Sequence, residues 1–144
     1  MTITASAGND GNEEVTNYPA AYDDYVIAVA ASDYNEDRAY YSTRGEYIDI
    51  TAPGGDITAD ENDDGYGDGV LQMTFSDGDP TDFAYHFFHG TSMSAPHVAG
   101  VAALLVSQGT SSPDKIREAL QESARDINDT GWDEETGWGL LDAP

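Results

Sequence analysis

The residues whose types and spacing most clearly suggest catalysis lie in one segment, GTSMSAPHVAG, at positions 90–100. Its first serine, Ser92, leads into an apolar stretch of small residues that predicts a buried helix over residues 91–107. A hydroxyl at a helix N-terminus lies beside backbone N–H groups without helical partners, which favour developing negative charge. Acyl transfer to a serine needs this arrangement. In most G-T-S sequences the serine would only cap the helix, so the motif needs support from other segments.

The run closely resembles the catalytic-serine signature of the subtilisin-like serine peptidases (subtilases, peptidase family S8). It differs from the G-x-S-x-G elbow of α/β-hydrolases, because Ser94 stands two residues after Ser92. Upstream, residues 5–10 (ASAGND) resemble the oxyanion-hole segment of the same family. The resemblance implies that Ser92 is the nucleophile and that Asn9 offers its side-chain amide to the oxyanion, beside the Ser92 backbone N–H. It also implies one wall of the substrate pocket, formed by Ala5, Ser6, Ala7 and Gly8.

Further segments resemble the family in the same order along the chain. Residues 18–22 (YPAAY) resemble a segment near the substrate pocket whose proline is typically cis, and residues 137–143 (GWGLLDA) resemble the end of the catalytic domain. The resemblance implies a three-layer α/β fold with a mostly parallel sheet. It also implies an extracellular endopeptidase that binds peptide or protein substrates as an added extended strand. No signal peptide is visible in the chain itself.

The aspartate and histidine motifs of the family, D-T/S-G and H-G-T-H-V-A-G, do not occur in this sequence. We therefore expect residues 1–144 to be the C-terminal part of a catalytic domain, with the N-terminal part as a missing partner. His97 is no substitute base, because it lies about 140° around the helix from Ser92. His86 and His89 are interpreted as packing or surface residues. Without a base, the isolated chain is expected to have no useful proteolytic rate.

An acidic segment, DENDDGYGD at residues 60–68, has the spacing of an EF-hand-like calcium loop. Glycine at its sixth position permits the sharp turn, whereas Leu71 replaces the bidentate glutamate at position 12 and predicts weak to moderate affinity. An acidic turn in an acidic protein is the alternative. The predicted Ca²⁺ ligands are Asp60, Asn62, Asp64, Asp68 and the carbonyl of Tyr66.

Several strands and a second helix must position these residues. Continuous apolar runs predict buried strands at residues 25–31 and 47–51, and a short one at residues 2–5. Residues 70–75 and 84–88 are predicted to form a hairpin. Residues 137–141 are predicted to form a short strand that contains glycines. Ser112 and Pro113 open a second helix with a cap and an N1 proline. With half of the fold missing, Val29 and its neighbours are expected to show an apolar edge to water.

The charge of the chain is the unusual part of its composition. Asp and Glu total 28 against 5 Lys and Arg, which gives a formal net charge of -23. Nucleic-acid binding is disfavoured because phosphates need a basic surface. The apolar stretch Val98–Val106 is too short to cross a bilayer, and the absence of cysteine excludes disulfides. The acids are spread along the chain, as in a folded protein with the acidic surface of a halophile.

Two alternatives to the peptidase remain open. The chain could be a non-catalytic calcium-binding or interaction module derived from a peptidase. It could also be an unrelated serine esterase, which the GTSMSAP run disfavours. An upstream reading frame with D-T-G and H-G-T-H motifs would discriminate the enzyme from the module.

The net charge generates a prediction about salt. Self-repulsion at -23 destabilises the compact state unless salt screens it. The urea midpoint of unfolding is therefore expected to rise with NaCl into the molar range. A midpoint that does not change with salt would contradict this prediction.

Overall fold

The computed structural model describes residues 1–11, 15–75 and 78–143. Three parallel strands form a sheet in the order β1 (Thr4–Ser6), β2 (Ile27–Ser32) and β3 (Ile50–Pro53). All six residues of β2 are buried. This burial explains the continuous apolar sequence of β2, since a parallel strand that is covered on both faces has no polar alternation.

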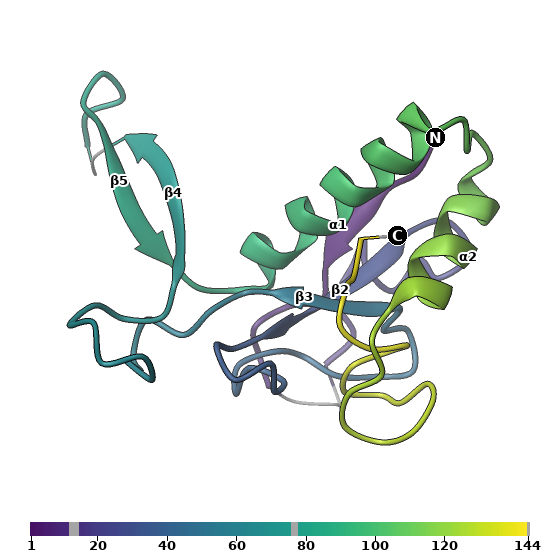
Figure 1. Cartoon of the computed structure of the whole chain (residues 1–144), viewed down its shortest axis with the longest axis horizontal. Coiled ribbons are helices and arrows are strands. Elements are labelled where there is room, and N and C mark those ends of the chain that lie inside the picture. The colour runs from purple at the N-terminus through teal and green to yellow at the C-terminus, as the bar shows by residue number, and fades with distance from the viewer. Residues whose placement is uncertain (12–14, 76–77, 144) are drawn as a thin grey trace.

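Both helices lie on one face of this sheet (Figure 1). They are α1 (Thr91–Ser107) and α2 (Pro113–Ser123). The register places Val29 opposite Ile50, so these side chains share a face. The core on that face consists of strand residues Ile27, Val29, Ile50 and Ala52 with helix residues Val98, Ala102, Leu105, Ile116 and Leu120. Loops cover the other face, where Ala7, Ala30 and Ile48 form a second cluster.

A β-hairpin projects from this body just before α1 (Figure 1). Its strands are β4 (Val70–Phe75) and β5 (Phe83–Phe88), paired antiparallel with Leu71 opposite Phe87 and Met73 opposite Tyr85. The strands alternate between half-buried and exposed residues over most of their length. The hairpin therefore adds little to the core, and its last residue stands four positions before Ser92.

The expected α/β architecture with a mostly parallel sheet is confirmed. Two local predictions are wrong. Residues 137–141 form no strand but only isolated bridges, in which Leu140 pairs with Thr51 and Arg125 and Gly137 pairs with Asp133. Val29 does not face water, because helices and loops cover both faces of β2 and leave it 0% exposed. None of the helices in the described part of the chain is both long and apolar enough to cross a membrane.

A buried carboxylate, Asp49, connects β3 to its neighbours. Asp49 Oδ2 accepts the N–H of Ala28 in β2 at 2.8 Å, and Oδ1 accepts a bond from Gln121 of α2 at 3.0 Å. The guanidinium of Arg117 lies 3.3 Å from Oδ1 and also donates to the Val26 carbonyl at 2.6 Å. Burial raises the pKa of Asp49 to about 6, although the Ala28 N–H and Arg117 oppose this shift.

This raised pKa predicts a pH dependence of stability. The folded state keeps the Asp49 proton up to about pH 6, whereas the unfolded chain loses it near 3.8. The contribution of Asp49 is therefore largest below pH 3.8 and is lost as pH rises through about 6. Between about pH 4 and 7, the free energy of unfolding of wild type should fall by roughly 2–3 kcal/mol relative to Asp49→Asn. Urea denaturation of both proteins measures this difference, and a constant difference would contradict the prediction.

Candidate active site

Ser92 is the second residue of α1 and its side chain is exposed. The helix begins after Gly90, whose φ of 141° belongs to a region that favours glycine. A Cβ on Gly90 would lie 3.4 Å from Asn9 Nδ2, which leaves nearly enough room for a side chain. The backbone conformation is therefore the main reason for glycine at this position. The N–H of Ser92 belongs to the first helical turn, where backbone donors have no partner within the helix. Ser92 thus combines an accessible hydroxyl with a free helical N–H.

Asn9 is fixed beside Ser92 through the intervening Thr91. Its Oδ1 accepts the Thr91 backbone N–H at 2.9 Å and the Thr91 hydroxyl at 2.9 Å. The same hydroxyl accepts the N–H of Gly8 at 3.2 Å. Because Oδ1 is the acceptor in both bonds, the amide group Nδ2 is oriented as the donor end of this exposed side chain. The structure therefore brings Asn9 and the Ser92 turn together, although Asn9 and Thr91 are 82 positions apart in the sequence.

The segment assigned to the substrate-pocket wall connects β1 to Asn9. Ala5 and Ser6 end the strand, and the N–H of Ala7 continues its pairing by donating to Val29 O at 2.9 Å. Ala7 is buried and Gly8 is half-buried. The Tyr18–Pro19 peptide bond is cis, as the resemblance implied. Strand β1 thus fixes the direction in which the chain reaches the serine.

A buried tyrosine that the motif analysis did not single out supports the serine turn. Tyr41 Oη accepts the Gly90 N–H at 3.0 Å and donates to the Gly55 carbonyl at 2.7 Å. Burial raises the pKa of Tyr41 to about 12, so its hydroxyl keeps its proton at neutral pH. Gly54 O also accepts the Gly90 N–H, at 3.0 Å. A Cβ on Gly54 would lie 2.7 Å from the Ser94 hydroxyl, so this glycine allows α1 to approach β3.

The three histidines bond to or pack against other groups. His97 Nδ1 donates to the Met93 carbonyl at 2.8 Å, because a carbonyl oxygen can only accept. His89 Nδ1 accepts the Ile57 N–H at 3.2 Å, and its ring packs against Tyr41. His86 lies within β5. Across residues 1–11, 15–75 and 78–143, no hydrogen bond joins a histidine to Ser92.

The proposed calcium ligands Asp60, Asn62, Asp64, Tyr66 and Asp68 share one exposed loop. Asp60 accepts the N–H groups of Asp64 at 3.1 Å and Gly65 at 3.0 Å, and the φ of Gly65 is 88°. Asp68 Oδ2 instead accepts the Glu61 N–H at 2.6 Å. The described residues contain no group of three or more His, Cys, Asp or Glu side chains that could hold a metal ion. The loop has the expected turn, but its carboxylates do not converge.

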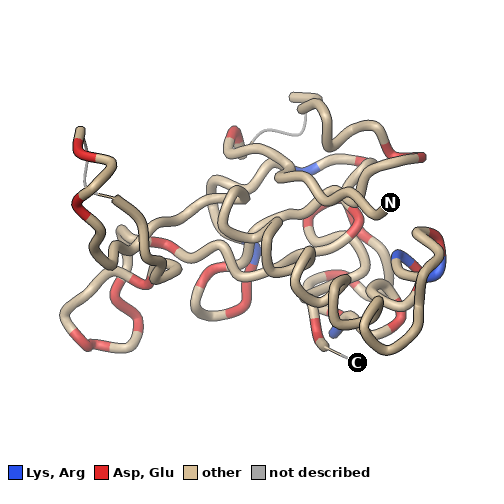
Figure 2. The backbone as a smooth tube through the Cα atoms, turned by 90° about the horizontal axis from the view of Figure 1, so that it is seen from above, with Lys and Arg blue, Asp and Glu red and all other residues tan. Residues whose placement is uncertain are grey.

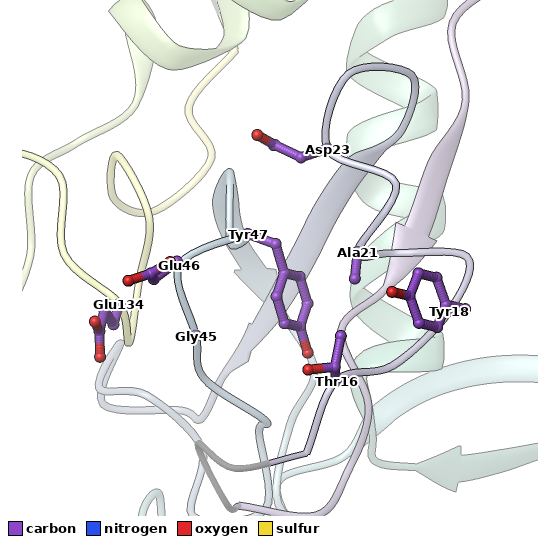
Figure 3. Close-up of a pocket in the computed structure, with 8 residues that line it drawn as sticks. All are labelled: Thr16, Tyr18, Ala21, Asp23, Gly45, Glu46, Tyr47 and Glu134. Carbon is purple, nitrogen blue, oxygen red and sulfur yellow. The ribbon is translucent and has the colours of Figure 1, made fainter.

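The structure contains a cavity of about 610 Å³ (Figure 3). Its eight lining residues are Thr16, Tyr18, Ala21, Asp23, Gly45, Glu46, Tyr47 and Glu134. The Tyr47 hydroxyl donates to the Ala7 carbonyl at 3.4 Å, which connects the cavity to the pocket-wall segment. Neither Ser92 nor Asn9 lines it, so the cavity is not the nucleophile site.

Comparison with known proteins identifies relatives over nearly the whole chain. Residues 1–139 match the sequence model of the Subtilase family. Thermitase from Thermoactinomyces vulgaris is 41% identical over 129 residues, which are 90% of this chain and 38% of thermitase. The halolysin-like extracellular serine protease Nep from Natrialba magadii is 36% identical over 142 residues, which are 98% of this chain and 22% of Nep.

A solved structure is similar as well. A protease from Pseudoalteromonas arctica superimposes with a TM-score of 0.80 at 36% identity, covering 99% of this chain and 40% of that chain. The chain therefore spans less than half the length of each of these three proteins.

The support that Tyr41 gives to the serine turn can be tested by substitution. Tyr41→Phe removes the donor to Gly55 and one acceptor of the Gly90 N–H, both of them buried. We expect the free energy of unfolding to fall by about 1–3 kcal/mol, measured by urea denaturation. Tyr40→Phe is the matched control, since Tyr40 is 62% exposed, and should change it by less than about 0.5 kcal/mol. Equal effects of the two substitutions would contradict this role.

Proposed function

Because the chain belongs to the subtilase family, we propose that it is the nucleophile-bearing part of a serine endopeptidase. Residues 1–144 would form the C-terminal part of its catalytic domain, with the base and its orienting acid on the N-terminal part. One observation carries this proposal. The amide oxygen of Asn9 binds both the N–H and the hydroxyl of Thr91, the residue before Ser92, which supports a role of the amide beside the nucleophile.

The chemistry follows from these positions. The Ser92 hydroxyl would attack a peptide carbonyl while a general base takes its proton. The resulting oxyanion would accept bonds from the Ser92 N–H and from Asn9 Nδ2. The base would then return the proton to the departing amine and leave an acyl group on Ser92, which water hydrolyses. Tyr41 and Gly90 would hold the turn in place, so that neither donor has to reorganise during the reaction.

Substrate binding is proposed at the end of β1. Ala5, Ser6, Ala7 and Gly8 would form one wall of the pocket for the residue before the scissile bond. The small side chains of this wall are compatible with a roomy pocket. The name of Nep describes an extracellular protease, and we propose the same location for this protein. Its substrates would then be extracellular peptides or proteins.

Hydrolysis of a chromogenic peptide tests the proposal. The isolated chain is expected to show no useful rate, because it supplies no base to Ser92. A fusion that places the preceding catalytic segment of thermitase before Met1 should hydrolyse the peptide, and Ser92→Ala should abolish this activity. Asn9→Ala should lower kcat by about 10²–10³-fold, the loss already established for the oxyanion-hole asparagine of subtilisin. Asn35→Ala, in an exposed loop, is the control and should leave kcat unchanged.

Two results would count against this function. Hydrolysis that survives Ser92→Ala would come from another residue or from a contaminant. A well-folded fusion without Ser92-dependent hydrolysis would favour the alternative, a non-catalytic interaction module.

We also propose a structural Ca²⁺ in the acidic loop, with Asp60, Asn62, Asp64, Asp68 and the Tyr66 carbonyl as its ligands. The turn at Gly65 and the two bonds to Asp60 support it, whereas binding would require the carboxylates to draw together. At a 10–100-fold excess over Kd, calcium should stabilise the chain by about 1–3 kcal/mol. The measurement is the melting temperature in calcium and in EDTA.

The calcium proposal has a matched control. Asp60→Asn should remove the calcium-dependent shift. Asp79→Asn should keep it, although Asp79 accepts similar local bonds from Thr81 in the other exposed turn. A melting temperature that is independent of calcium would refute the site.

A further inference from the structure

The β4–β5 hairpin has one face on which large apolar side chains are exposed to water. Residues directly opposite in an antiparallel pair lie on one face, and so do residues two apart along a strand. Three cross-strand pairs therefore share this face: Leu71 with Phe87, Met73 with Tyr85, and Phe75 with Phe83. We call these six residues the apolar ladder. Their exposed fractions range from 39% to 69%.

The less exposed face of the same hairpin is the more polar one. Five half-buried residues lie on it: Val70, Gln72, Thr74, Ala84 and His86. A hairpin that served only to cover the body would bury its large apolar side chains and expose its polar ones. This hairpin does the reverse. A contiguous apolar surface of this kind is typical of a site that binds another molecule.

The apolar ladder is large enough for a stable contact with a copy of itself. Four of its residues are aromatic, and an aromatic side chain offers about 150–250 Å². At exposed fractions of 39% to 69%, the six residues present on the order of 600 Å² to water. Two such faces together remove roughly 1,200 Å² from water, which reaches the lower limit for specific protein interfaces. Aromatic residues and Met are also enriched at such interfaces.

The charge of the chain favours a second copy as the partner of this face. The strands β4 and β5 contain no Asp, Glu, Lys or Arg, although the formal net charge is -23. Figure 2 shows acidic residues in the turns and loops that flank these strands. Two chains of this charge can approach closely only where neither presents a carboxylate. A basic partner would instead be held by carboxylates, which the apolar ladder lacks.

We propose that the apolar ladder is a homodimer contact, in which two copies of this chain stack their hairpins face to face in an antiparallel two-fold arrangement. The hairpin projects from the body, so this arrangement keeps the two acidic bodies at opposite ends of the dimer (Figure 1). Met73 and Tyr85 form the middle pair and lie on the two-fold axis, each against its counterpart. The outer pairs contact each other, because this axis exchanges the base of the hairpin with its tip. The proposal does not depend on the proposed peptidase function.

Sedimentation equilibrium of the 144-residue chain tests the contact. In about 1 M NaCl, where charges are screened within about 3 Å, the average mass should rise with protein concentration from 15.4 kDa toward twice that value. In about 0.1 M NaCl the dimer Kd should be at least about tenfold higher, because the acidic bodies repel each other. Circular dichroism checks that the chain is folded in both solutions. A mass that stays at 15.4 kDa up to about 1 mM protein in the higher salt would overturn the proposal.

Substitutions locate the contact on the hairpin. Met73→Arg should raise the dimer Kd at least about tenfold, because it buries two like charges against each other at the axis. Leu104→Arg is the matched control, since it adds the same charge at another exposed apolar residue, in α1, and should change Kd less than about twofold. Both residues are exposed, so neither substitution should unfold the chain. A mixture of Met73→Arg with Met73→Asp should associate again as a heterodimer, which a misfolded variant would not do.

Three further results would overturn the proposal. Dimerisation that is lost through Leu104→Arg but kept in Met73→Arg would assign the contact to α1. Failure of the mixed Met73→Arg and Met73→Asp chains to associate would refute the antiparallel arrangement. A chain that stays monomeric, but binds the preceding catalytic segment of thermitase and loses that binding through Met73→Arg, would assign the apolar ladder to another part of the catalytic domain.

Discussion

The bonds between Asn9 and Thr91 are the interaction on which the candidate site depends. One amide oxygen accepts both the N–H and the hydroxyl of Thr91, and so ties the end of β1 to the first turn of α1. Other contacts hold the same turn. Gly90 provides the backbone conformation of the turn, and Tyr41 with Gly54 anchors its N–H. Rotation of Asn9 away from Thr91 would separate the two proposed oxyanion donors.

The charge of this acidic chain is distributed unevenly over its elements. The carboxylates lie mostly in loops, where water and salt can screen them. Among the described acidic residues Asp49 alone is buried, and it is compensated by Ala28, Gln121 and Arg117. The stretches that form α1 and β1 carry no formal charge, and the same stretches carry the proposed nucleophile and the oxyanion donor. The proposed catalytic residues therefore lie on stretches of the chain that carry no formal charge.

Much of the architecture was predictable because it depends on local patterns. The apolar run at residues 25–31 predicted a buried strand, and the small-residue run after Gly90 predicted α1 over residues 91–107. The predicted strand at residues 137–141 failed, because this segment forms only isolated bridges, at Gly137 and Leu140. The exposure expected for Val29 also failed. Helices α1 and α2, which are distant from it in sequence, cover its side chain, and the sequence around Val29 carries no signal of that contact.

The sequence by itself determined the family, the serine motif, the acidic balance and the order of the main elements, because these properties reside in residue types and short spacings. Tertiary structure alone decided which groups meet. Tyr41 and Tyr40 are adjacent and chemically identical, yet only the fold buries one of them against Gly90 and leaves the other in water. It likewise turned Asn9 toward Thr91 and left the outer side of α1 uncovered. Such contacts join residues that are distant in sequence, and only the packing of strands and helices brings those residues within bonding distance.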